Sequence, residues 1–191
     1  DRRILSFYDP KHHICEEYRL LGKNMMHLLA STVGVDPRMG KIIALSSSVR
    51  GEGKTMTSTN LAITLAQDFP DRVLLMDADL RHPKVHRYVG LAPHSGFNDL
   101  LASANPAGIL EDSLLRTDGG LHLLLSSPSG RNPSALLDSP NTNRLFQLLR
   151  ERYALVIVDT PPVLLATDGL TIGSRTDGML FLLRARKTQR E

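Results

Sequence analysis

The sequence predicts an α/β fold in which helices cover both faces of an open, mainly parallel sheet. Three observations favour it. Short apolar runs that are typical of buried strands alternate with longer stretches of helical periodicity. Two of these runs end in aspartate, and another leads into a loop of small residues, as expected at the ligand-binding edge of a parallel sheet. The length of 191 residues suits one domain, which we expect to span residues 1–191.

The expected strands are short apolar runs bounded by turn-forming or charged residues. They cover residues 41–46, 72–77, 121–126, 154–159 and 178–183. The expected helices are either amphipathic stretches or short helical pieces among prolines. They cover residues 16–29, 54–68, 98–103, 107–115, 141–152 and 166–174. From the first strand onward, strands and helices therefore alternate, as they do in parallel sheets.

Each longer helix is expected to pack one apolar face on the sheet. In the first helix, which Gly34 and Pro37 end, this face holds Tyr18, Leu21, Met25, Leu28 and Leu29. In the second it holds Leu61, Ala62, Leu65, Ala66 and Phe69. In the helix over 141–152 it holds Leu145, Phe146, Leu148 and Leu149. Irregular structure is expected at residues 1–13 and 128–133, and a solvated basic tail at 184–191.

Composition excludes several classes of function. The net charge of +3 is small and aromatic residues make up only 5%, with no tryptophan, so nucleic-acid binding is not expected. The single cysteine, Cys15, rules out an internal disulfide and a cysteine-based metal cluster. No apolar run approaches the roughly 20 residues of a membrane span. Because the chain begins at Asp1 rather than Met, we expect it to be processed or excised from a longer protein.

The loop over residues 46–55 is the strongest chemical signal. It lies between an expected strand and an expected helix, and it ends in Gly-Lys-Thr. Small residues let successive backbone N–H groups turn toward a polyphosphate, and the helix directs its positive end to the same point. Lys54 would then reach the outer phosphates, while the Thr55 hydroxyl would bind magnesium. The strict pattern has glycine where this chain has Ser48, and the alternative interpretation is a plain turn.

Three aspartates follow two of the expected strands. Asp77 and Asp79 end one strand and, being two residues apart, are expected to face the same space. Asp159 ends another strand and precedes two prolines. Each could be an ordinary turn or capping residue, but three carboxylates beside a phosphate loop repel one another unless a metal and Lys54 offset their charge. The sequence therefore predicts that loop and carboxylates converge on one metal-bound nucleotide.

Three separated motifs make the chain resemble the catalytic domain of bacterial tyrosine kinases, which belong to the MinD/ParA-like P-loop ATPases and control capsule and exopolysaccharide export. The motifs cover residues 47–55, 74–83 and 156–162. The middle one is the most specific, because generic P-loop proteins lack it. Weaker matches cover residues 132–137, 167–169 and 16–21.

The resemblance implies an ATP-dependent kinase that phosphorylates tyrosines of its own or a neighbouring subunit. It assigns catalytic roles to Asp77, as the base for the tyrosine proton, and to Lys54 and Asp79. It implies that Thr55, Asp79 and Asp159 hold magnesium, Asp159 through water. The nucleotide-binding set would be Arg50, Gly51, Glu52, Gly53, Lys54, Thr55 and Met56. Arg50 and Arg81 would either add charge near the γ-phosphate or be ordinary surface arginines.

The resemblance also implies partners and a location. A membrane-anchored polysaccharide co-polymerase, fused or separate, would activate the domain at the inner face of the plasma membrane. Family members form rings through a motif of one glutamate and two arginines; here Glu16 and Arg19 match, but Gly22 replaces the second arginine. The family's C-terminal tyrosine cluster is not in this sequence, whose four tyrosines are Tyr8, Tyr18, Tyr88 and Tyr153, so either the tail has been cut off or this member lacks it.

Two other functions remain open at this stage. One is a nucleotide-switch ATPase of the MinD/ParA type, although those relatives usually carry a lysine where this chain has Val49. The other is a regulator that binds ATP without catalysis and reports it to an export complex, which the missing tyrosine cluster would favour.

Overall fold

The computed structural model describes residues 4, 9, 11–31, 41–127 and 132–185. Several expectations lie wholly or largely outside these residues, namely the irregular start, the helix end at Gly34 and Pro37, the turn at 128–131 and most of the basic tail. Within the described residues, no helix is both long and apolar enough to cross a membrane.

A six-stranded sheet forms the centre of the described structure, in the order β3-β4-β2-β5-β1-β6. The strands are β1 (Lys41–Ser47), β2 (Val73–Asp77), β3 (Leu115–Arg116), β4 (Leu121–Leu124), β5 (Leu155–Asp159) and β6 (Gly178–Leu182). All neighbours are parallel except β3, which runs antiparallel to β4 at one edge. Residues of β1, β2, β4 and β5 are buried throughout, which explains why these strands are mainly apolar rather than alternating between apolar and polar residues.

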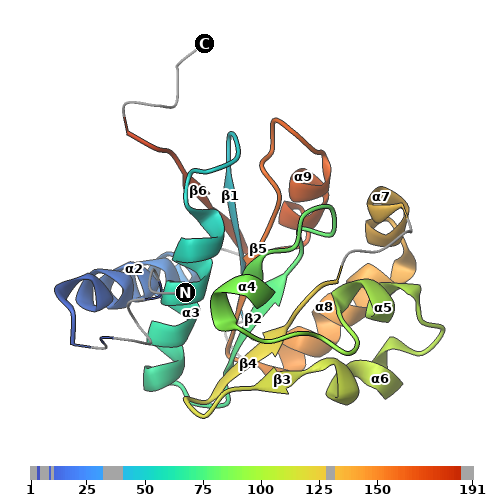
Figure 1. Cartoon of the computed structure of the whole chain (residues 1–191), viewed down its shortest axis with the longest axis horizontal. Helices are drawn as coiled ribbons and strands as arrows, with labels where there is room; N and C mark the ends of the chain where they lie inside the picture. The colour runs from blue at the N-terminus through green and yellow to red at the C-terminus, as the bar shows by residue number, and fades with distance from the viewer. Residues whose placement is uncertain (1–3, 5–8, 10, 32–40, 128–131, 186–191) are drawn as a thin grey trace.

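Helices cover both faces of this sheet, as the sequence predicts (Figure 1). On one face lie α2 (His13–Ala30), α3 (Lys54–Asp68) and the short α4 (Val85–Val89), which share a core with Leu75 and Ile157. The opposite face carries α5 (Phe97–Ala102), α6 (Pro106–Ser113), α7 (Pro133–Leu137), α8 (Pro140–Arg152) and α9 (Asp168–Gly173). Their core includes Met76 and Val156 of the sheet. The α/β fold class is confirmed.

Three short elements differ from the sequence expectation. The strand β3 and the helices α4 and α7 fall in stretches rich in proline or in charge, where two to five residues give too short a window for periodicity. Two residues expected on apolar helix faces are also exposed. Phe69 is 49% exposed because α3 ends at Asp68, and Leu28 is 66% exposed at the end of α2.

Candidate active site

The loop between β1 and α3 has the backbone that phosphate binding requires. Gly51 and Gly53 adopt left-handed conformations, with φ of 85° and 97°, which side chains with a Cβ rarely adopt. Glu52 folds back within the loop, so that its carboxylate accepts a 2.9 Å hydrogen bond from the Val49 N–H. Gly53 directly precedes the 15-residue helix α3, so the N–H groups of the loop lie next to the positive end of this helix.

Lys54 points back along the loop in this structure. Its Nζ donates to the Ser47 hydroxyl over 2.9 Å, and the residue is 9% exposed. Burial lowers the pKa of Lys54, and the negative charges of Asp159 and Asp79 oppose this shift. The ammonium group is thus held beside the loop by a weak neutral partner, from which an anion would readily draw it.

Asp159 and Thr55 join β5 to the first turn of α3. The Thr55 hydroxyl donates to one Asp159 carboxylate oxygen over 2.6 Å. The other oxygen, Oδ1, is buried and, among the described residues, accepts no hydrogen bond. Burial raises the pKa of Asp159 to about 7, against the opposing effects of the Thr55 hydroxyl and the Lys54 charge. An unsatisfied buried carboxylate oxygen is costly, and a bound cation would satisfy this one.

Asp77 lies beside Asp159, because the two residues are paired in the register of β2 and β5. Its side chain is fully buried and accepts hydrogen bonds from the N–H groups of Lys84 and Val85, at 2.9 and 3.0 Å, and of Asp79 at 3.2 Å. Burial raises the pKa of Asp77 well above its usual range and the Asp159 charge raises it further, while the two amides of α4 and its cap oppose the shift.

Asp79 is more open than Asp77. Its carboxylate accepts the His82 N–H over 2.9 Å and lies at a cavity of about 80 Å³ above the loop. The cavity is lined by Arg50, Gly51, Gly53, Lys54, Thr55, Asp79, His82, Lys84, Tyr88 and Pro162. The fold therefore brings the loop and Asp79 to one cavity, with Asp77 and Asp159 buried at the strand ends beside it.

Arg81 makes a contact that the sequence interpretation missed. Its guanidinium binds both carboxylate oxygens of Asp168 at 2.6 and 3.2 Å, and it also donates to the Ser134 hydroxyl over 3.0 Å. Asp168 is 2% exposed, so this ion pair ties the segment after β2 to α7 and α9. It accounts physically for the weaker motifs at residues 132–137 and 167–169, which supply the serine and the aspartate.

Arg50 and Met56, the two ends of the predicted nucleotide-binding segment, flank the P-loop. Arg50 is exposed at the cavity, and Met56 is half-buried in the first turn of α3. Ser47 belongs to the loop predicted from the sequence, whereas Lys84 and Tyr88 were not predicted as neighbours of the site. Cationic or aromatic residues beyond β2 have no spacing that singles them out in sequence.

The chain is similar in sequence to proteins named tyrosine-protein kinases. No family model matches the chain. The tyrosine-protein kinase YwqD of Bacillus subtilis (strain 168) is 32% identical over 191 residues, which are 100% of this chain and 76% of YwqD. The tyrosine-protein kinase ptk of Acinetobacter johnsonii is 40% identical over 149 residues, but these are only 20% of its length. The chain thus spans most of one relative and a fifth of another.

Solved structures share the fold. The BceF tyrosine kinase domain is 32% identical, with a TM-score of 0.79 over 97% of this chain and 72% of that chain. The kinase domain of the Escherichia coli tyrosine kinase ETK is 27% identical, with a TM-score of 0.81 over 94% of this chain and 67% of that chain. The septum site-determining protein MinD of Pyrococcus horikoshii, complexed with Mg-ADP, is 20% identical with a TM-score of 0.62 over 75% of this chain and 58% of that chain, and shows the fold alone. With its identity to YwqD, and with the P-loop and strand-end aspartates in place, this chain belongs to the bacterial tyrosine-kinase family.

Proposed function

We propose that this chain is the catalytic part of an ATP-dependent protein-tyrosine autokinase that regulates exopolysaccharide or capsule synthesis and export. The observation that carries the proposal is the meeting of the P-loop with Asp77, Asp79 and Asp159 at one edge of the sheet. Phosphoryl transfer needs positioning and charge compensation more than covalent help, and this edge offers both.

The loop would hold the phosphates of ATP. Backbone N–H groups of residues 51–55 would bind them, with Arg50, Glu52 and Met56 completing the binding segment. Lys54 would leave the Ser47 hydroxyl and bridge the two outer phosphates, since a phosphate oxygen is a stronger partner than a neutral hydroxyl.

Magnesium fits the donors that surround this loop. The unpartnered Asp159 oxygen, the Thr55 hydroxyl and the Asp79 carboxylate are all oxygen donors, which is the ligand type magnesium prefers. The described residues contain no ready-made group of three His, Cys, Asp or Glu ligands, which suits an ion that keeps several waters and shares phosphate oxygens. When bound, magnesium would offset the charge of the phosphate oxygens.

Asp77 would act as the base. The acceptor hydroxyl forms a bond to the γ-phosphorus, the bond between that phosphorus and the β–γ bridging oxygen breaks, and the hydroxyl proton passes to Asp77 as ADP leaves. The raised pKa of Asp77 favours this role. Because the carboxylate is buried under the backbone of Lys84 and Val85, the segment that covers it must shift when the tyrosine binds.

The partners follow from the same proposal. Acceptor tyrosines would come from this chain or a neighbouring subunit, and a membrane-anchored polysaccharide co-polymerase would hold the domain at the inner face of the plasma membrane. Contacts between subunits would use α2. In this structure Arg19 instead pairs with Glu16 on the same helix and donates to Gln67 of α3 over 3.1 Å, so assembly would compete with these internal bonds.

The test is direct. The protein is incubated with ATP, magnesium and a tyrosine-rich acceptor peptide, and phosphotyrosine is detected on both protein and peptide. We expect label with the wild type and none with Lys54→Met, which should weaken phosphate binding as well as catalysis. Steady release of phosphate with nucleotide-dependent dimerisation but no phosphotyrosine would instead favour a switch ATPase. Binding with negligible turnover would favour a regulator.

A further inference from the structure

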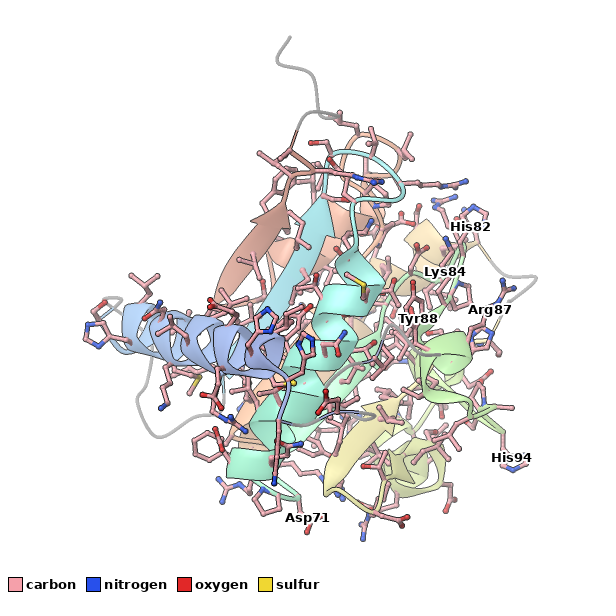
Figure 2. The ribbon with its side chains drawn as sticks, turned by 60° about the vertical axis from the view of Figure 1, so that its left-hand side comes forward. Asp71, His82, Lys84, Arg87, Tyr88 and His94 are labelled. Atoms are coloured by element: carbon pink, nitrogen blue, oxygen red, sulfur yellow. The ribbon has the colours of Figure 1, made fainter. Side chains whose placement is uncertain are left out.

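A larger cavity of about 300 Å³ adjoins the nucleotide site. It is lined by Arg50, Arg81, His82, Pro83, Lys84, His86 and Arg87. All but the proline carry a cationic or imidazole side chain, and no carboxylate is among them. Figure 2 shows His82, Lys84 and Arg87 on one side of the molecule, next to Tyr88 of the smaller cavity.

The charges around this cavity are largely uncompensated. Arg81 is paired with Asp168, but Arg50, Lys84 and Arg87 form no ion pair with any described residue. Three free cations around one concave surface repel one another and focus a positive potential into it. Such a surface is stabilised by an anion.

His86 supplies a second and independent sign of a missing partner. Its ring nitrogen Nδ1 is buried and makes no hydrogen bond within the described part of the chain. Burial, followed by the neighbouring Arg87 charge, lowers the pKa of His86, so the ring is neutral at neutral pH and Nδ1 can carry a donor proton. His86 also lines the cavity, so a ligand that turned its ring would give this nitrogen a hydrogen-bond partner.

The position of the cavity indicates which anion it would meet. Arg50, His82 and Lys84 line both this cavity and the smaller one above the P-loop. An extended peptide advances at most about 3.6 Å per residue, so residues one to three places from an acceptor tyrosine come within reach of the adjoining cavity. In the proposed function the phosphates of ATP bind the P-loop, so they would not occupy this cavity.

We propose that this basic cavity is a specificity subsite that binds acidic side chains next to the acceptor tyrosine of a peptide substrate. The inference rests on the proposed kinase function, because it presumes that a tyrosine is presented at the shared wall. Arg87 is the residue to test, since it is exposed on α4, lines only the larger cavity and has no role in nucleotide binding.

The binding experiment needs no catalysis. A fluorescent peptide with two Glu residues on each side of a Phe, which replaces the acceptor tyrosine, is titrated with the protein in Mg-ADP and followed by anisotropy. A matched peptide has Gln in place of each Glu. We expect the Glu peptide to bind about tenfold tighter, and Arg87→Glu to remove most of this preference. Arg144→Glu, an exposed arginine of α8 on the other face of the sheet, should leave the preference intact.

Three results would overturn the subsite. These are equal binding of the two peptides, equal losses in Arg87→Glu and Arg144→Glu, or a loss of ADP affinity in Arg87→Glu as large as its loss of peptide affinity. Arg87→Ser, which removes the charge without reversing it, should show a smaller loss in the same direction. Corresponding tyrosine peptides then separate the two proposals. Preferential binding without phosphorylation would contradict the kinase function alone, while equal phosphorylation of both peptides would contradict the subsite alone.

Discussion

The sheet has an amino edge, where its parallel strands begin, and a carboxyl edge, where they end. These two edges bury polar side chains in opposite ways. At the amino edge, His122 of β4 is bonded to the Tyr153 hydroxyl at 2.9 Å and to Asp71 at 3.2 Å. Asp71 accepts only, so the single ring proton of a neutral His122 lies on Nε2 and the Tyr153 hydroxyl donates to Nδ1. Burial raises the pKa of Tyr153, which keeps that hydroxyl protonated. Every polar atom of the two buried rings has a partner.

The carboxyl edge is left incomplete. Of three buried side-chain polar atoms that lack a hydrogen bond in the described residues, two lie here, on Asp159 and His86. Asp77 and Asp159 lie side by side with raised pKa values, and unpaired cations surround the neighbouring cavity. Figure 2 shows Asp71 at the bottom of the molecule, away from His82 and Lys84 on its right-hand side. Satisfied networks stabilise a fold, whereas unsatisfied ones indicate where ligands complete it.

The largest expected effect comes from Asp159→Asn. The carboxyl group has a pKa of about 7 when folded, against an ordinary 3.8. Between these values the unfolded chain releases the proton and the folded chain retains it, so the wild type loses stability as the pH rises from about 4 to 7. Asparagine does not ionise. Without nucleotide, Asp159→Asn should be more stable than the wild type at pH 8 by on the order of 4 kcal/mol.

Urea unfolding at pH 4 and pH 8 measures this effect. The difference between variant and wild type should be small at the lower pH and level off above pH 7. Stabilisation by Mg-ADP should shrink in the variant, because the metal loses a carboxylate. A variant that is less stable at pH 8 without nucleotide would show that Asp159 is an ordinary structural residue.

Asp77→Asn should separate chemistry from binding. We expect phosphate transfer to fall by roughly 100-fold or more, the scale of a lost general base, while ATP affinity changes only a few fold. The amide oxygen of asparagine can still accept hydrogen bonds from the N–H groups of Lys84 and Val85, so the start of α4 should stay in place. Single-turnover transfer and nucleotide titration give the two numbers.

Asp79→Asn is the matched control for that variant. As a proposed metal ligand it should weaken magnesium-dependent binding, and raising the magnesium concentration should partly restore its activity. Wild-type transfer by Asp77→Asn, together with a large loss in Asp79→Asn that magnesium does not restore, would move the base from the buried to the exposed aspartate.

His122→Phe should produce the smallest of these effects, at the opposite edge. It leaves the buried Tyr153 hydroxyl without its partner, which costs about 1–2 kcal/mol of unfolding free energy. Urea unfolding measures this loss of stability. Nucleotide titration and the transfer assay at the same temperature should give wild-type values. A comparable loss of nucleotide affinity would show that the two edges are coupled.

Sequence reasoning reached most of the fold because its central strands are buried on both faces. Short continuous apolar runs between turn residues, such as β2 and β5, are typical of buried strands. The helix α3 matches its expected range of 54–68. The two-residue β3 and the five-residue α4 and α7 carry no periodicity, and tertiary contacts determine them. A helix end likewise decides whether Phe69 is buried.

The site was predictable in its location but less so in its detail. Parallel strands bring Asp77 and Asp159 to the same edge, so their proximity follows from topology. The burial of Asp77 beneath the amides of α4 does not, because no pattern predicted that helix. Nor does the pairing of Arg81 with Asp168, which are 87 residues apart in sequence. Contacts of this kind depend on how loops return to the sheet.

A crystal structure with ADP and magnesium tests the central claim most directly. We expect the phosphates to lie against the N–H groups of residues 51–55, with Lys54 released from Ser47, and the metal to lie beside Thr55, Asp79 and the free oxygen of Asp159. Phosphates bound elsewhere, or a metal remote from all three residues, would contradict the account.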